Sequence, residues 1–376
     1  MTNHTTIFTL IQNFLSETEL QAILKEFHYV ETARKCTVST LLHYLLGAAS
    51  YEWKSLRHAA DVGPSHGLVS VDHSSLSKHL KTLDFGVIKR MFEVIVDKLN
   101  RAARRRWKLP KKQLLSIDST TITVGKSRLP WAVYHGERSG VKLHVSLTNE
   151  TAMPLKGVET TGLQHDGPIG EQWEDARFVL VCDRAYFSID KVDRYQKEHQ
   201  NFVIRLKENV QINRKKSIKG GLNKASNILD DFTCILGTPQ KQTKQRHRVV
   251  DFFDHEGKEI RVVTNLMNVT AEEIANMYKS RWAIESFFRW IKQNLNVPVL
   301  LGTTKNAVFN QLFAALIAYV LFKFLHTQGS KQIHVQPLSF VGFTRLLLWN
   351  DLPLEWRIHI RKTLEFHREL NQGDIV

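Results

Sequence analysis

QLLSIDSTTITV, residues 113–124, is the stretch at which the hydrophobic pattern of this sequence changes. Upstream of it, TELQAILKEFHYV (residues 18–30) and CTVSTLLHYLLGAASYEW (residues 36–53) have apolar residues at three- and four-residue spacing, which predicts helices. From residue 113 onward, runs of Ile, Val, Leu and Thr predict β-strands instead. We therefore expect a helical region over residues 1–100, joined to a sheet that begins near residue 113.

The strands that follow come in a recognisable order. Short connections lead to VKLHVSLTN (141–149) and PLKGVETT (154–161), which favours an antiparallel meander. RFVLVCD (177–183) is a continuous apolar run, as expected for a strand buried on both faces. A predicted helix at 188–200 and a strand at 201–206 complete a β-α-β unit. Three meander strands followed by alternating helix and strand is the order of an α/β, RNase H-like mixed-sheet core.

The rest of the chain divides by composition. Residues 207–269 predict a β-rich insertion with a basic, loop-like beginning, and helices return at 271. The long apolar segment 307–325 contains Asn310, Gln311 and Lys323, so we expect a buried helix and no membrane span. The expected domains are a helical N-terminal domain (1–100), a basic linker (101–112), two parts of the RNase H-like core (113–206 and 270–330), the insertion between them, and a helical C-terminal region (331–376).

Charge is the feature of the composition that points to a partner. The chain has 52 Lys and Arg residues against 37 Asp and Glu residues, a net charge of +15, and a pI near 9.7. Nucleic acid is the leading partner for such a chain, and a basic protein without a polyanionic partner is the alternative. The three cysteines form no CxxC pair and no signal peptide is predicted, so we expect a cytoplasmic, nucleoid-associated protein.

Two segments are candidates for DNA contact. A helix at 55–62, a turn at Gly63 and Pro64, and a second helix capped by Asp72 and presenting Lys78 are compatible with a helix-turn-helix. An ordinary helical hairpin fits the same pattern. RAARRRWKLPKK (101–112) is either a solvated linker or an arm that follows DNA phosphates. The arm would use Arg104, Arg105 and Arg106.

Two aspartates follow apolar strand runs. Asp118 lies in LLSIDST and Asp183 ends FVLVCD. Singly, each would be interpreted as a turn former or a helix cap. If their strands are neighbours, the carboxylates lie side by side, where they repel each other unless a cation binds or one is protonated. A hard divalent ion, above all Mg²⁺, resolves that conflict.

The stretch NMYKSRWAIESFFRWIKQNL, residues 276–295, predicts a third carboxylate for this site. The capping box TAEE at 270–273 and a proline at 298 predict one helix over about 271–294. On such a helix four polar side chains share a stripe about 60° wide, and an apolar face is left for the core. A solvated face with an i,i+4 ion pair is the alternative. The stripe consists of Tyr278, Arg281, Glu285 and Lys292.

These residues resemble a known signature. Tyr, two residues, Arg, three residues, Glu, six residues, Lys is the pattern of the insertion-sequence-four family of DDE transposases, and every gap is matched here. The resemblance covers roughly residues 1–330 and implies that Asp118, Asp183 and Glu285 are both catalytic and metal-binding, with a β-rich insertion before the glutamate. His165 and Asp166 resemble a His-Asp pair of many such enzymes, and a loop histidine beside a capping aspartate is the alternative.

The resemblance implies a DNA transposase of a bacterial insertion sequence. Such an enzyme cleaves phosphodiester bonds at transposon ends and transfers the strands into target DNA in a cut-and-paste reaction, with a hairpin as one route. Its partners are double-stranded terminal inverted repeats, target DNA and a second subunit in a synaptic homodimer. We expect two Mg²⁺ ions, which Mn²⁺ can replace. Arg281, Lys292 and Tyr278 would bind phosphates and Trp282 an unpaired base.

Two other functions fit the same residues. A nuclease with an RNase H-like fold would use the same carboxylates without joining strands, and the sequence hardly separates it from a transposase. A DNA-binding regulator derived from a transposase would have lost at least one metal-binding carboxylate, whereas Asp118, Asp183 and Glu285 are all present. A strand-transfer assay distinguishes the first alternative.

Overall fold

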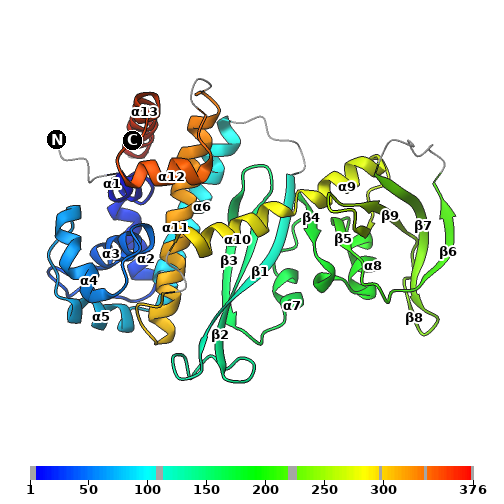
Figure 1. Ribbon diagram of the computed structural model, residues 1–376, viewed down its shortest axis with the longest axis horizontal. Helices are drawn as coiled ribbons and strands as arrows, with labels where there is room; N and C mark the ends of the chain where they lie inside the picture. The colour runs from blue at the N-terminus through cyan, green and yellow to red at the C-terminus, as the bar shows by residue number, and fades with distance from the viewer. Residues whose placement is uncertain (1–5, 107–112, 219–226, 296–298, 334–336, 374–376) are drawn as a thin grey trace. The chain divides into compact units, whose positions relative to one another are not determined.

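The chain divides into two compact units. Figure 1 shows the helices and strands in chain order by colour. The structure is a computed structural model that describes residues 6–106, 113–218, 227–295, 299–333 and 337–373. The first unit comprises residues 1–107, 124–139 and 288–376, and the second comprises residues 108–123 and 140–287. Each unit is thus assembled from segments that are far apart in the sequence.

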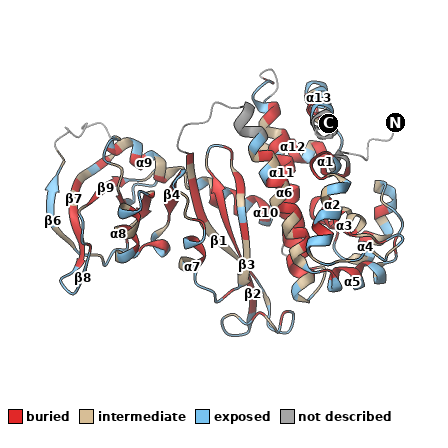
Figure 2. Ribbon diagram, turned by 180° about the vertical axis from the view of Figure 1, so that it is seen from behind, coloured by how far each residue is buried: buried red, intermediate tan, exposed pale blue. Residues whose placement is uncertain are grey.

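The first unit is helical, as the sequence predicted for its N-terminal part. Its long helix α11 packs against α3, α5 and α6, and is buried along most of its length (Figure 2). The helices are α1 (Thr6–Phe14), α2 (Glu17–Glu26), α3 (Val38–Ser50), α4 (Leu56–Val62), α5 (His73–Thr82), α6 (Phe85–Arg106), α11 (Lys305–Ser330), α12 (Phe340–Leu348) and α13 (Leu354–Gly373), with a short 3-10 helix η1 (Gly63–His66).

Helix α11 is a core helix. By length and hydropathy it could cross a membrane, but 94% of its most apolar window is buried inside the protein. Two of its polar side chains make hydrogen bonds inside the protein, because Asn310 donates to the carbonyl of Leu83 and Gln311 to the carbonyl of Val299. The prediction of a buried helix is confirmed. The structure groups this helix with the N-terminal helices, whereas the sequence placed it in the second part of the RNase H-like core.

The helix-turn-helix candidate is formed by α4, η1 and α5. Asp72 caps α5 as predicted, and its carboxylate accepts a hydrogen bond from the amide of Ser74. Lys78 and Lys81 are exposed on α5. The predicted linker at 101–112 begins as helix, since α6 continues to Arg106. The side chains of Arg104, Arg105 and Arg106, and all of 107–112, lie outside the described residues.

The second unit is built on a mixed sheet with the order β3-β2-β1-β4-β5-β10-β9-β7-β6. The predicted antiparallel pairing of β2 with β3 is confirmed, as is the parallel pairing of β4 with β1 and β5. The strands are β1 (Gln113–Gly125), β2 (Arg138–Thr148), β3 (Met153–Thr161), β4 (Phe178–Cys182), β5 (Asn201–Arg205), β6 (Ile212–Ser217), β7 (Ile228–Thr238), β8 (Lys241–Gln242), β9 (His247–Phe253) and β10 (Glu259–Thr264).

The β-rich insertion continues the core sheet. β10 pairs antiparallel with β5, and β9, β7 and β6 follow in turn. The basic segment predicted to be loop-like contains the edge strand β6, which pairs with β7. The insertion strands can extend the buried sheet because β10 and β9 contribute apolar side chains to both of its faces, as β4 and β5 do.

Helices cover both faces of this sheet. On one face, α8 (Ile189–Lys197) adds Val192 and Tyr195 to a core that contains Leu180 and Ile204. On the other, α9 (Ala271–Lys279) adds Ile274 and Tyr278 to a second core. A short helix α7 (Asp166–Glu171) follows β3. The central parallel strands are therefore covered by helices and apolar side chains on both faces of the sheet.

The predicted single helix at 271–294 is wrong, because the structure has two helices. α9 ends at Lys279 and α10 runs over Trp282–Asn294. Between them the amide of Arg281 bonds to the carbonyl of Tyr278, an i→i+3 contact that tightens the turn. Ser280 stabilises the break, since its hydroxyl donates to the carbonyl of Met277 and accepts from the side-chain amide of Asn149. Tyr278 therefore lies on a different helix from Glu285 and Lys292.

Candidate active site

The two aspartates lie on neighbouring strands. In the parallel register of β1 with β4, Ile117 is opposite Cys182, so the next residues are Asp118 and Asp183. Pairing with β4 ends there, although β1 continues to Gly125. The sequence predicted this arrangement from the apolar run before each aspartate. Both carboxylates lie where the buried part of the sheet gives way to partly exposed residues.

Arg281 links Glu285 to Asp118. One guanidinium nitrogen, Nη1, lies 3.3 Å from Asp118 Oδ2, and the other, Nη2, donates to Glu285 Oε1. The guanidinium also lies over the ring of Tyr278, 5.7 Å from its centroid. The Tyr278 hydroxyl in turn donates to Asp183 Oδ1 over 3.4 Å. Three carboxylates thus surround one cation and one hydroxyl.

Burial dominates the electrostatics of the site. The pKa of Asp118 is raised to about 6, mainly by burial and to a smaller extent by the carboxylates of Asp183 and Glu285, while the Ser119 amide and Arg281 oppose the shift. Burial likewise raises the pKa of Tyr278 to about 12, so its hydroxyl stays protonated and able to donate. The site is therefore an acidic group of side chains that binding of a cation would stabilise.

A divalent ion fits these donors chemically. Carboxylate oxygens are the ligands that Mg²⁺ and Mn²⁺ prefer. In the described part of the chain, no three His, Cys, Asp or Glu side chains converge closely enough to form a ready metal centre. Arg281 pairs with two of the three carboxylates, so a bound ion would have to replace its contacts.

The sequence also singled out Trp282, Lys292 and Lys78. Trp282 begins α10, is 43% exposed, and makes an edge contact with the His255 ring at 6.0 Å. Lys292 is exposed in the last turn of α10. Lys78 lies on α5 of the first unit.

Sequence reasoning missed a polar network next to Asp118. Asp166, from the His-Asp pair, accepts a hydrogen bond from Ser119, which directly follows Asp118. Lys142 and His144 on β2 face the same carboxylate. The alternation of β2 could have signalled it, because Lys142 and His144 point to one face of the strand, whereas Val141, Leu143, Val145 and Leu147 point to the other.

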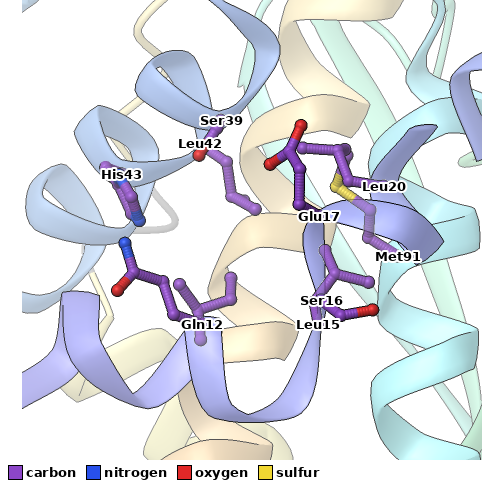
Figure 3. Close-up of a pocket in the computed structure, with 10 residues that line it drawn as sticks. Gln12, Leu15, Ser16, Glu17, Leu20, Ser39, Leu42, His43 and Met91 are labelled. Atoms are coloured by element: carbon purple, nitrogen blue, oxygen red, sulfur yellow. The ribbon is translucent and has the colours of Figure 1, made fainter. Parts of the chain in front are cut away.

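The helical unit has a hollow of its own. A cavity of about 300 Å³ lies among α1, α2, α3 and α6, and is lined in part by Leu15, Leu42 and Met91. Figure 3 shows Gln12 and His43 pointing toward one another at its side. Burial lowers the pKa of His43 to about 4, which leaves the ring neutral. With one carboxylate in its lining, this cavity lacks the acidic set found beside Asp118.

Fold and site together define a class of protein. The chain has an RNase H-like sheet with aspartates at the ends of adjacent parallel strands, and Arg281 links one of them to a glutamate on α10. Such an arrangement of carboxylates is expected of a metal-dependent phosphoryl transferase. The fold is also that of a solved piggyBac transposase in a synaptic complex with hairpin DNA. That likeness has a TM-score of 0.52 at 12% identity and covers 96% of this chain and 84% of the other.

Comparison with known sequences gives the family. The family described as "Transposase DDE domain" matches residues 109–321. A protein of Geobacillus stearothermophilus described as a probable transposase for insertion sequence element IS5377 is 51% identical over 95% of this chain and 94% of its own length. A Synechocystis protein with the corresponding description for element IS4SA is 28% identical over 68% of this chain and 72% of its own. The chain belongs to the DDE transposases, enzymes that generally use divalent metal ions.

Proposed function

We propose that Asp118, Asp183 and Glu285 are the catalytic carboxylates of this transposase and hold Mg²⁺, or Mn²⁺ in its place. The observation that carries the proposal is that the register of β1 with β4 makes the aspartates neighbours while Arg281 contacts both Asp118 and Glu285. The single positive charge of Arg281 is shared by two carboxylates, so it cannot neutralise both. Such crowding is costly for stability and is typical of a site that binds further positive charge.

The reaction proposed is cleavage of a phosphodiester bond at the transposon end, followed by strand transfer. The bound ions supply activation of the attacking oxygen and stabilisation of the leaving oxygen. Arg281 is suited to the phosphate, since its guanidinium offers several donors and lies at the carboxylates already. Tyr278 supplies a protonated hydroxyl beside Asp183, and exposed Trp282 a stacking surface for an unpaired base.

The substrate proposed is double-stranded DNA carrying the terminal repeats. A net charge of +15 favours phosphate binding, and the piggyBac neighbour is solved with hairpin DNA. Helix α5, with exposed Lys78 and Lys81, is the proposed groove-binding helix, and Lys292 a further phosphate contact. We propose a homodimer as the working unit, because two transposon ends must be joined in one complex, and cytoplasmic action at the bacterial nucleoid.

The experiment that tests the triad combines cleavage with DNA binding. Asp118→Asn, Asp183→Asn and Glu285→Gln should each lower cleavage of a terminal-repeat duplex by roughly a thousandfold, a loss of about 4 kcal/mol of transition-state stabilisation. Gel-shift binding of the same duplex should persist. Asp190→Asn is the matched control, since that carboxylate is exposed on α8 and pairs with Lys241. Cleavage by any triad variant at the rate of the control would refute the assignment.

A second assay separates the transposase from a nuclease with the same fold. A pre-cleaved end with a free 3′-OH is offered together with supercoiled target DNA. Joining of the two molecules is expected for strand transfer, whereas a nuclease would cut the duplex and yield no joint product. Triad variants must abolish both reactions if one site performs them.

A further inference from the structure

A partly buried polar network adjoins Asp118 through the next residue, Ser119. The carboxylate oxygen Asp166 Oδ1 accepts a hydrogen bond from the Ser119 hydroxyl at 2.8 Å and from Lys142 Nζ at 3.2 Å. The ring nitrogen His144 Nδ1 lies 3.4 Å from the same oxygen. Asp166 is the first residue of α7, whereas its partners lie on β1 and β2. The network therefore joins two strands of the sheet to the segment that follows β3.

The surroundings hold Asp166 in place. His144 is fully buried, and its Nε2 lies 2.9 Å from the Thr160 hydroxyl on β3. Lys142 Nζ also donates to the carbonyl of Gln164 at 2.8 Å. The side chain of Asp166 is 25% exposed and that of Lys142 is 13% exposed, so this ion pair is partly shielded from water. A carboxylate with several fixed donors has little freedom to turn.

Ser119 connects this network to the catalytic carboxylate. Its backbone amide donates to Asp118 Oδ1 at 2.8 Å, while its hydroxyl donates to Asp166. One residue thus contacts both acids through separate donors. Rotation of the Asp118 side chain would break the first bond, and displacement of Ser119 is opposed by the second.

We propose that Asp166 is a positioning residue, which acts through Ser119 to hold the Asp118 carboxylate in the orientation that binds the metal ion. The inference rests on the proposed function of Asp118 and extends it to a residue outside the triad. Of the His-Asp pair, only the aspartate takes part, because His165 is exposed and its side chain makes no capping bond to α7. Partners that orient a metal ligand commonly change metal affinity by about 10- to 100-fold.

Metal binding without DNA is the direct readout. Full-length protein is titrated with MnCl₂ by calorimetry, with free Mn²⁺ followed by electron paramagnetic resonance. Asp166→Ala and Ser119→Ala should each weaken binding about tenfold. Asp166→Asn keeps an acceptor for the Ser119 hydroxyl and should weaken it less. His165→Ala is the matched control at the neighbouring position and should bind as the unaltered protein does.

A double-variant cycle separates positioning from general packing. If Asp166 acts through Ser119, the double variant Ser119→Ala/Asp166→Ala should bind Mn²⁺ no more weakly than either single variant. Additive losses in the double variant would overturn the inference, as would unchanged affinity in both single variants. Ser119→Ala keeps the test decisive if Asp166→Ala does not fold, as judged by circular dichroism.

The same titration distinguishes this inference from the proposed function. Asp118→Asn should lose Mn²⁺ binding if the triad is the metal site. Retained binding in Asp118→Asn would overturn the proposed site and the inference with it. Lost binding in Asp118→Asn with unaltered binding in both Ser119→Ala and Asp166→Ala would overturn the inference alone.

Discussion

Two regions of one sheet bury acidic side chains in opposite ways. On β7 and β9, Asp231 and Asp251 each have an arginine of their own. Arg248 contacts both oxygens of Asp231, and Arg261 contacts both oxygens of Asp251. At the ends of β1 and β4, in contrast, Arg281 contacts Asp118 and also Glu285.

The difference teaches how to tell a structural ion pair from a functional one. A bidentate pair is complete, so it needs nothing further and holds the strands together. Carboxylates that share one cation are incompletely paired, and the pKa of Asp118 is raised by burial and, to a smaller extent, by the carboxylates of Asp183 and Glu285. The ratio of acidic side chains to fixed cations, more than the presence of buried acids, distinguishes the proposed active site.

The largest expected change in the free energy of unfolding comes from breaking the complete Arg248–Asp231 pair. Arg248 is almost fully buried and also donates to the carbonyls of Leu266 and Val269. Arg248→Met should lower the free energy of unfolding by about 3–5 kcal/mol, because it leaves the Asp231 charge buried and unpaired. Urea denaturation measures the loss. Arg177→Met is the control, since its pair with Asp175 is largely exposed and should be worth under about 1 kcal/mol. Equal losses would contradict the distinction.

The next largest effect is a gain in the free energy of unfolding, expected when Asp118 is replaced. The folded-state pKa of Asp118, about 6, lies above the ordinary value of 3.8. The contribution of the Asp118 carboxyl to the free energy of unfolding is therefore fully present below pH 3.8, when the carboxyl is protonated. It is lost as the pH rises through 6. Asp118→Asn mimics the protonated form and should raise the free energy of unfolding by about 1–3 kcal/mol at pH 8.

Thermal denaturation in EDTA across pH 4–8 checks this prediction. The gain from Asp118→Asn should shrink toward pH 4, whereas Asp251→Asn should destabilise the protein at pH 8, because it weakens a complete pair with Arg261. A destabilised Asp118→Asn protein at pH 8 would show that the Asp118 carboxylate is as well compensated as that of Asp251.

A third prediction concerns the pH dependence of cleavage. At limiting Mg²⁺, cleavage should rise by up to about tenfold per pH unit below pH 6, since the metal ion binds the ionised Asp118 carboxylate. Raising the Mg²⁺ concentration should move the midpoint to lower pH, because the ion competes with the proton. Initial rates on a terminal-repeat duplex between pH 5 and pH 8 measure it. A midpoint that does not respond to Mg²⁺ would assign the titration to another group.

The smallest effect is expected at Tyr278. Its hydroxyl donates to Asp183 over a long 3.4 Å, while its buried ring packs against Phe252 with centroids 6.2 Å apart. Tyr278→Phe keeps the ring and should change the free energy of unfolding by less than about 1 kcal/mol. Tyr278→Ala, which removes the ring, should cost about 3–5 kcal/mol. Similar losses for Phe and Ala would make the hydroxyl the main contribution.

The sequence predicted the active-site strands because the relevant pattern is local. An apolar run that ends in an aspartate signals a buried strand whose end is polar, and two such runs, at Asp118 and Asp183, were enough to expect neighbouring carboxylates. The spacing of Tyr278, Arg281, Glu285 and Lys292 added the glutamate. The prediction that these four residues share a stripe on one helix is wrong, because α9 ends at Lys279 and α10 begins at Trp282.

By itself, then, the sequence determined most of the strands and helices, the acidic residues and the family resemblance. Hydrophobic period and residue spacing are properties of consecutive residues, so they can be interpreted without coordinates. Only the tertiary structure decided that β10 pairs with β5, that Asn149 stabilises the break at Ser280, and that Asp166 reaches Ser119. Each of these is a hydrogen bond between residues far apart in the chain, and packing brings such partners together without leaving a local pattern.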